Sequence, residues 1–81
     1  MILERYVIEH TNSRNGREFF ANEGAHFWTS KTFWMTAFFT EQAGIDVAKS
    51  IAETQDCSAA AVKAYFDTDK CILTIPGYTE P

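Results

Sequence analysis

The chain has 81 residues and a formal net charge of -4, and 46% of its residues are hydrophobic, 15% aromatic and 22% charged. This composition is typical of one folded domain, although a chain this short buries only about 60 to 65% of the surface that its unfolded form exposes. An acidic chain lacks the basic surface that nonspecific binding to nucleic acid or to anionic membranes requires, so we expect a protein partner, particularly one with a basic surface.

The first part of the chain predicts a β-hairpin. Residues 2–11 are rich in β-branched and aromatic side chains, as strands are. Asn15-Gly16 predicts a type I′ turn because both residues tolerate positive φ, and residues 17–22 then return as the second strand. Phe19 and Phe20 point to opposite faces of that strand, so one ring leaves the main core unless the second face is also covered.

An aromatic stretch follows at residues 25–40, after a break at Glu23-Gly24. Residues 26–29 predict a third short extended segment, and Thr29 or Ser30 can cap a brief helical turn that runs to Met35. The stretch contains six large rings: Phe27, Trp28, Phe33, Trp34, Phe38 and Phe39.

We expect most of these six rings to be core, as aromatics between a sheet and a helix usually are. Neighbours diverge in a strand and in a helix, so one ring of each adjacent pair tends outward. Phe38 and Phe39 are expected to anchor the helix to the sheet. Trp28 and Trp34 are the rings expected to contact a partner, together with Phe20 of the first hairpin.

Residues 41–54 predict the one long helix. Thr40 suits the N-cap, Glu41 suits the positive helix end, and apolar residues recur at helical spacing. Gly44 inside the helix indicates either close packing on the sheet or fraying of the first turn. The opposite side carries four acidic residues that form either a solvated face or an acidic surface for a partner: Glu41, Asp46, Glu53 and Asp56.

The last part of the chain predicts a second hairpin. Residues 60–66 suit a helix through their alanines and a strand through Val62, Tyr65 and Phe66, and the plain β segment at 71–75 favours the strand. The tail at 78–81 is expected to be loosely held. The fold class is therefore α+β, with a small antiparallel sheet of three or four strands packed on one main helix in a ββαββ-like order, in a single domain spanning residues 1–81.

No pattern typical of a catalytic or metal site is present. His10, His26, Cys57 and Cys71 make a possible zinc set, but each stands alone, whereas structural zinc sites draw on close ligand pairs. We therefore expect free thiols, no metal, no cofactor, no small-molecule substrate and no enzymatic activity. The absence of a signal pattern and of a long apolar run favours a cytoplasmic protein that does not span a membrane.

Two other roles remain open from the residues. Arg5, Arg14 and Arg17 could contact phosphates beside hairpin aromatics, which would make a nucleic-acid-binding module. Exposed rings and a free strand edge could instead pair with a second copy, which would make a structural homo-oligomer or a homodimer.

The order of elements resembles small phage-encoded inhibitor proteins of the anti-CRISPR or host-takeover type. The resemblance lies in the layout: a Tyr6-Val7-Ile8 strand, an Asn-Gly turn, a Phe-Phe strand, the segment from Trp28-Thr29 to Phe39-Thr40, one helix and a final hairpin. It implies a non-enzymatic inhibitor that binds a host or defence complex in the cytoplasm of a bacterial host, by steric block or by acidic imitation of nucleic acid. It carries no functional residue over, because these inhibitors share no common site.

Overall fold

The computed structural model describes residues 1–14, 16–22 and 27–81. Over these residues the chain forms one α-helix and a five-stranded antiparallel sheet, with the strand order β3-β2-β1-β4-β5. The elements in chain order are β1 (Ile2–His10), β2 (Phe19–Phe20), β3 (Trp28–Thr29), the 3-10 turn η1 (Thr32–Trp34), α1 (Glu41–Gln55), β4 (Ala59–Asp67) and β5 (Ile72–Thr74). The α+β class is confirmed, and the sheet has one strand more than the three or four expected.

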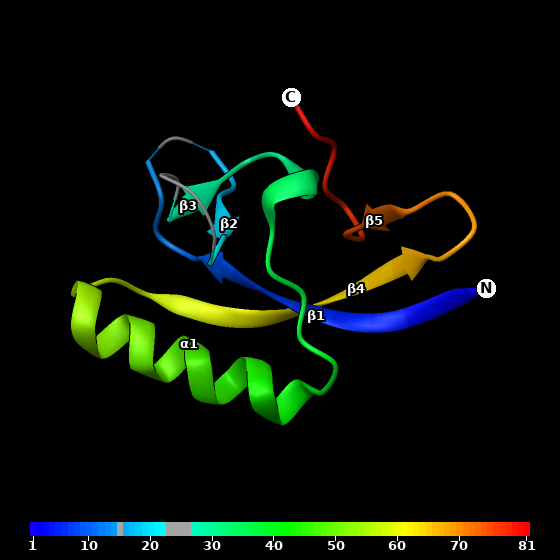
Figure 1. The fold of residues 1–81 in the computed structure, drawn as a ribbon. Coiled ribbons are helices and arrows are strands. Elements are labelled where there is room, and N and C mark those ends of the chain that lie inside the picture. Colours follow the sequence, from blue (N-terminus) through cyan, green and yellow to red (C-terminus); the bar gives the residue numbers. More distant parts are fainter. Residues whose placement is uncertain (15, 23–26) are drawn as a thin grey trace.

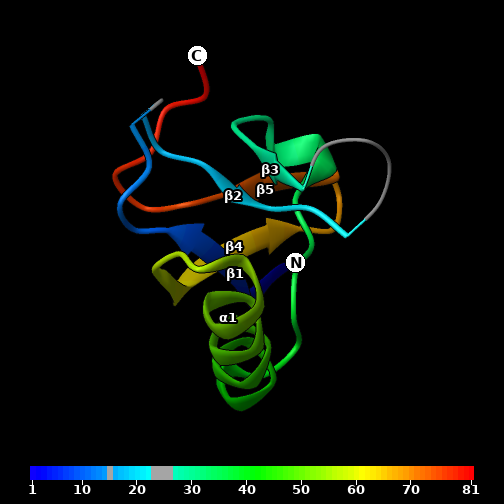
Figure 2. The same ribbon diagram turned by 90° about the vertical axis from the view of Figure 1, so that its left-hand side faces the viewer.

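The two long strands β1 and β4 form the middle of the sheet. They pair along their whole length, from Ile2 opposite Asp67 to His10 opposite Ala59. The ambiguous segment at 60–66 is therefore a strand, as its context predicted. Figures 1 and 2 show α1 along one side of this pair, and η1, β5 and the C-terminal segment on the other.

Both faces of the sheet carry a hydrophobic cluster. The helix-side cluster is built from Ile8, Phe20, Ala48 and Ile51, and the far-side cluster from Val7, Phe19, Met35, Ala64 and Ile75. Since successive strand residues alternate between faces, Phe19 and Phe20 enter different clusters, and their exposed fractions are only 0% and 5%. The second face is covered, so neither ring leaves the core.

The helix begins and ends where local chemistry favours it. The Thr40 hydroxyl accepts a hydrogen bond from the Ala43 N–H at 3.2 Å, which confirms the predicted N-cap. Gly44 is buried against the sheet, and a Cβ built on it would lie 3.4 Å from the Cβ atoms of Ala61 and Tyr6. Of the two explanations for Gly44, close packing is the one that the structure shows.

The first hairpin differs from the predicted two-residue turn. Glu9 lies opposite Phe19, and the His10 N–H donates to the Glu18 carbonyl at 2.9 Å, so the loop covers residues 11–17. A tight turn at 15–16 would instead pair Ser13 with Glu18. The wider register places Phe19 in the far-side cluster, and the polar loop side chains find partners, such as the Ser13 hydroxyl on the Glu18 carboxylate at 2.6 Å. Asn15 and residues 23–26 lie outside the described residues. The latter include the predicted break at Glu23-Gly24 and the first residue of the extended segment predicted at 26–29.

The aromatic stretch is less buried than expected. None of its six rings is fully buried, and four are exposed: Phe27 (39%), Phe33 (86%), Trp34 (48%) and Phe39 (78%). The expectation that most of them are core is wrong, because the core positions in this region are taken by Phe19, Phe20 and Met35. Phe38 packs in the helix-side cluster, but Phe39 points away and does not anchor the helix.

The C-terminal tail is held, not loose. Tyr78 is half-buried, and its ring meets that of Phe19 edge to face, with centres 5.0 Å apart. Its hydroxyl donates to the Ser30 carbonyl, and the Thr32 N–H donates to the Glu80 carboxylate. The tail therefore fixes the segment that leads into η1.

Candidate protein-binding surface

The η1 turn carries two exposed rings, Phe33 and Trp34. The turn is closed by the Trp34 N–H on the Lys31 carbonyl at 3.0 Å and the Met35 N–H on the Thr32 carbonyl at 3.2 Å. Met35 then returns to extended backbone and enters the far-side cluster, which leaves Phe33 and Trp34 outside. Their rings meet edge to face with centres 5.1 Å apart. We call this pair the η1 ridge.

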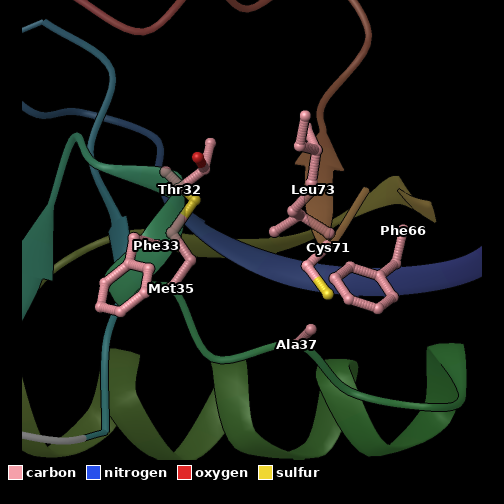
Figure 3. A pocket seen from close by; sticks show the side chains of 8 residues that line it. Thr32, Phe33, Met35, Ala37, Phe66, Cys71 and Leu73 are labelled. Carbon is pink, nitrogen blue, oxygen red and sulfur yellow. The ribbon is translucent and has the colours of Figure 1, made fainter. Parts of the chain in front are cut away.

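A hollow lies on either side of the ridge. The first, of about 320 Å³, separates η1 from β5, and Figure 3 shows Phe33 and Met35 on one side of it with Phe66, Cys71 and Leu73 on the other. The second, of about 360 Å³, is lined by Asn22 and by residues 33–36. Phe33 and Met35 line both hollows, so an apolar ridge stands between two concave surfaces.

Hydrogen bonds fix the ridge from both ends. On one side the Glu80 carboxylate accepts from the N–H and the hydroxyl of Thr32, and these bonds hold the pKa of Glu80 below its usual value. On the other side the Thr36 N–H donates to the Phe20 carbonyl at 3.0 Å, and the Thr36 hydroxyl accepts from the Asn22 N–H at 2.8 Å. A partner would therefore meet a preformed surface and lose little entropy in ordering it.

The sequence located part of this surface. Trp34 is exposed, as expected, and Trp28 is half-buried, with its ring 4.7 Å from the His10 ring. Phe20 lies in the helix-side cluster and cannot contact a partner unless the chain opens, so its assignment to the surface is wrong. Phe27, Phe33 and Phe39 are the exposed rings that sequence reasoning missed, although each belongs to an adjacent pair from which one ring was expected outside.

The four acidic residues are all exposed but do not form one cluster. Asp46 and Glu53 are seven residues apart, nearly two helical turns, and share the solvent side of α1. Glu41, five residues before Asp46, is rotated about 140° from it and lines a groove beside β4. Asp56 ends the helix in the left-handed region, with φ of 51°. Asp46 and Glu53 thus form an acidic pair on one side of the helix, whereas Glu41 and Asp56 lie apart from them.

Two of the three arginines of the nucleic-acid hypothesis are engaged by different groups of the chain. The Arg17 guanidinium donates twice to the Glu9 carboxylate, at 2.8 and 3.0 Å, and lies 5.4 Å from the ring centres of Phe19 and Tyr78. The Glu9 hydrogen bonds raise the pKa of Arg17 further. Arg5 instead lies over Phe39. An arginine already engaged by a carboxylate and two rings is less available to a phosphate.

The described residues offer little for metal chemistry. Cys57 and Cys71 are free thiols, half-buried and exposed respectively. Over residues 1–14, 16–22 and 27–81, no three His, Cys, Asp or Glu side chains gather closely enough to hold a metal ion. His26, the remaining member of the possible zinc set, lies outside the described residues. The same part of the chain has no helix with the length and apolarity that crossing a bilayer requires.

No protein-family model, curated protein or solved structure matches this chain.

Proposed function

We infer that the chain is a protein-binding domain that contacts its partner through the η1 ridge. The observation that carries this proposal is the Phe33 ring, which is 86% exposed on a turn fixed by hydrogen bonds at both ends. Aromatic residues dominate the binding energy of protein interfaces, particularly where a ring enters a pocket and the partner fills the adjoining hollows. Exposing such a ring costs hydrophobic free energy that a partner would recover.

The finer part of the proposal concerns the partner. The net charge of -4 favours a partner with a basic surface, such as a protein that handles nucleic acid. In keeping with the resemblance described above, we propose that the partner is a host or defence nucleoprotein complex in the bacterial cytoplasm. The domain would block it sterically, without catalysing a reaction. Asp46 and Glu53 lie on α1, on the other side of the sheet from the η1 ridge, so they would attract a basic partner at long range and would not contact it at the ridge.

Affinity capture from a bacterial host with paired variants tests this function. The double variant Phe33→Ala, Trp34→Ala removes the ridge, and the proposal predicts that it loses the protein that the unchanged chain retains. A reversed-charge variant, Asp46→Lys with Glu53→Lys, separates the acidic contribution and should weaken capture less. Purified partner then gives the dissociation constant, and a phage-protection assay tests inhibition.

Three results would contradict the proposal. The first is capture of the same partner with equal affinity by the ridge variant. The second is turnover of a substrate by the purified domain. The third is salt-dependent binding to single-stranded RNA or DNA that the Arg14 and Arg17 substitutions remove, which would support the nucleic-acid-binding module instead.

A further inference from the structure

The first half of β4 has an open edge. β1 pairs with β4 along its whole length, but β5 pairs only with residues 65–67. Among the residues that the structure describes, none forms a strand beside residues 59–63 on the β5 side. Figure 1 shows β5 beside the C-terminal end of β4 only, whereas the N-terminal part of β4 runs beside α1 with no strand outside it.

Hydrogen bonds made by neighbouring residues show which backbone groups of β4 face this edge. The Thr11 N–H donates to the Ser58 carbonyl at 3.0 Å, so every second residue of β4 from Ser58 onward bonds to β1. On the other edge of β1, Tyr6 exchanges both of its hydrogen bonds with Phe38, at 2.9 and 2.7 Å, so its cross-strand neighbour Lys63 also faces away from β1. The N–H and C=O groups of Ala59, Ala61 and Lys63 thus point to the open edge.

The side chains of this edge leave it accessible. Residues 59–61 are three alanines, and the edge contains neither a proline nor a bulge, which are two of the usual devices that prevent edge pairing. The Ala61 methyl group faces Gly44 of α1, so it does not block the approach of another backbone. Lys63 is the only charged residue among residues 59–63, and it forms an ion pair with Glu4 of its own chain at 3.8 Å.

The open edge is complementary to itself. In an antiparallel pair centred on Ala61, that residue lies opposite its own copy, and Ala59 lies opposite Lys63 of the second copy. Each of the three outward-facing residues brings one donor and one acceptor, so this register satisfies every free group on both edges. The two lysines lie at opposite ends of the paired stretch and do not repel each other.

Charges on α1 favour the same arrangement. A groove of about 340 Å³ runs between the edge and α1, and Glu41 and Lys49 both line it. Glu41 precedes Gly44 by about 4.5 Å along the helix axis, and Lys49 follows it by about 7.5 Å. A twofold axis at Ala61, under Gly44, makes the helix of the second copy run in the opposite direction. Measured along the helix axis, Glu41 of one copy then lies about 3 Å from the position of Lys49 of the other.

We propose that two copies of this chain form a symmetric dimer by pairing their open β4 edges into one continuous sheet, with Glu41 facing Lys49 across the twofold axis. The η1 ridge takes no part in this contact. A result that contradicts the dimer therefore leaves the proposed function untouched, and a result that contradicts the proposed function leaves the dimer untouched.

Three variants and one measurement on the unchanged chain test the dimer. Sedimentation at micromolar to millimolar concentrations gives the dissociation constant. Ala61→Pro removes an N–H that bonds to nothing within the chain, and it should weaken the dimer at least tenfold. Lys49→Glu brings like charges together and should weaken it by about tenfold over the two symmetric contacts. Adding Glu41→Lys to Lys49→Glu exchanges the charges and should restore the affinity to within about threefold.

Amide hydrogen exchange of the unchanged chain keeps the proposal testable if a variant misfolds. The amides of Ala59, Ala61 and Lys63 should exchange more slowly as concentration rises, while those of Ala60 and Val62, already bonded to β1, change little. A chain that stays monomeric throughout, or a dimer in which Ala61→Pro and these amides have no effect, would overturn the proposal.

Discussion

The guanidinium of Arg5 lies over the ring of Phe39, with its carbon 4.7 Å from the ring centre. The neighbouring Phe38 forms a bridge with Tyr6 of β1 and packs on the helix side. Since successive extended residues point to opposite faces, Phe39 emerges on the far side, where it remains 78% exposed. One residue of the pair thus fastens the chain before α1 to the sheet, and the other is free for contact.

Alanine substitutions of these two neighbours should have unequal effects on stability. Phe38→Ala opens a cavity in the helix-side cluster and should lower the free energy of unfolding by about 2 to 3 kcal/mol. Phe39→Ala removes an exposed ring and a cation–π contact and should cost about 0.5 kcal/mol. Urea denaturation of the two variants measures the difference. Equal losses would mean that Phe39 anchors the helix after all.

The elements of this fold could be predicted because local chemistry determines them. Thr40 and Glu41 mark the helix start, and the β-branched residues mark β1 and β5. β4 has one β-branched residue, Val62, and its strand was predicted from its position before β5. The hairpin register could not be predicted in the same way. It depends on which face of the sheet buries Phe19, and the observed register also brings Arg17 onto Glu9.

The exposed rings were harder to predict for a related reason. A single turn such as η1 has too few residues to show a period, so the pattern around Phe33 and Trp34 could indicate only that one ring faces outward. Both rings are exposed because Met35 fills the space beneath them. What buries a ring here is a tertiary contact that the neighbouring sequence does not encode.

The helix C-terminus offers a site for stabilisation. Asp56 has φ of 51° and ψ of 50°, a left-handed conformation that glycine adopts without the steric cost of a Cβ. Asp56→Gly should therefore raise the free energy of unfolding by about 0.5 to 1 kcal/mol. Asp56→Ala is the matched control, because it removes the same carboxylate but keeps the Cβ, and it should be destabilising by about 1 kcal/mol. Thermal unfolding ranks the three chains, and an alanine variant more stable than the glycine variant would refute the explanation.

The stability of the fold should decline at alkaline pH through Tyr78. Burial raises the pKa of this phenol above 10.0, and the nearby Glu80 carboxylate raises it further, while Arg17 opposes both. The folded chain keeps the Tyr78 proton where the unfolded chain loses it. The stabilising contribution is complete below about pH 10 and is lost as the pH rises through the folded-state pKa.

Tyr78→Phe checks this effect, since it removes the ionisable group but keeps the ring on Phe19. Its free energy of unfolding should lack the Tyr78 part of the alkaline decline. At neutral pH it should be about 1 kcal/mol lower, because the hydrogen bond to the Ser30 carbonyl is lost. An ultraviolet titration should also lose its most alkaline phenol transition. An unchanged titration curve would show that another tyrosine carries the shift.

The η1 ridge should respond to acid through Glu80. The N–H and the hydroxyl of Thr32 both donate to this carboxylate, and with Lys31 nearby they hold its pKa below 4.5. Because the folded-state pKa is lowered, the contact stabilises the fold above about pH 4.5 and is lost as the pH falls through the folded-state value. The Thr32 amide resonance should therefore shift together with the Glu80 carboxyl carbon in an NMR titration.

Two variants test this contact, one at the donor residue and one at the acceptor. Thr32→Val removes the hydroxyl but keeps the N–H, so the pKa of Glu80 should return part of the way toward its usual value. Glu80→Gln removes the titrating group, and the Thr32 amide should then stay unchanged through the acid range. If that amide still titrates in the Glu80→Gln chain, a different carboxylate holds η1, and the tail cannot be what fixes the ridge.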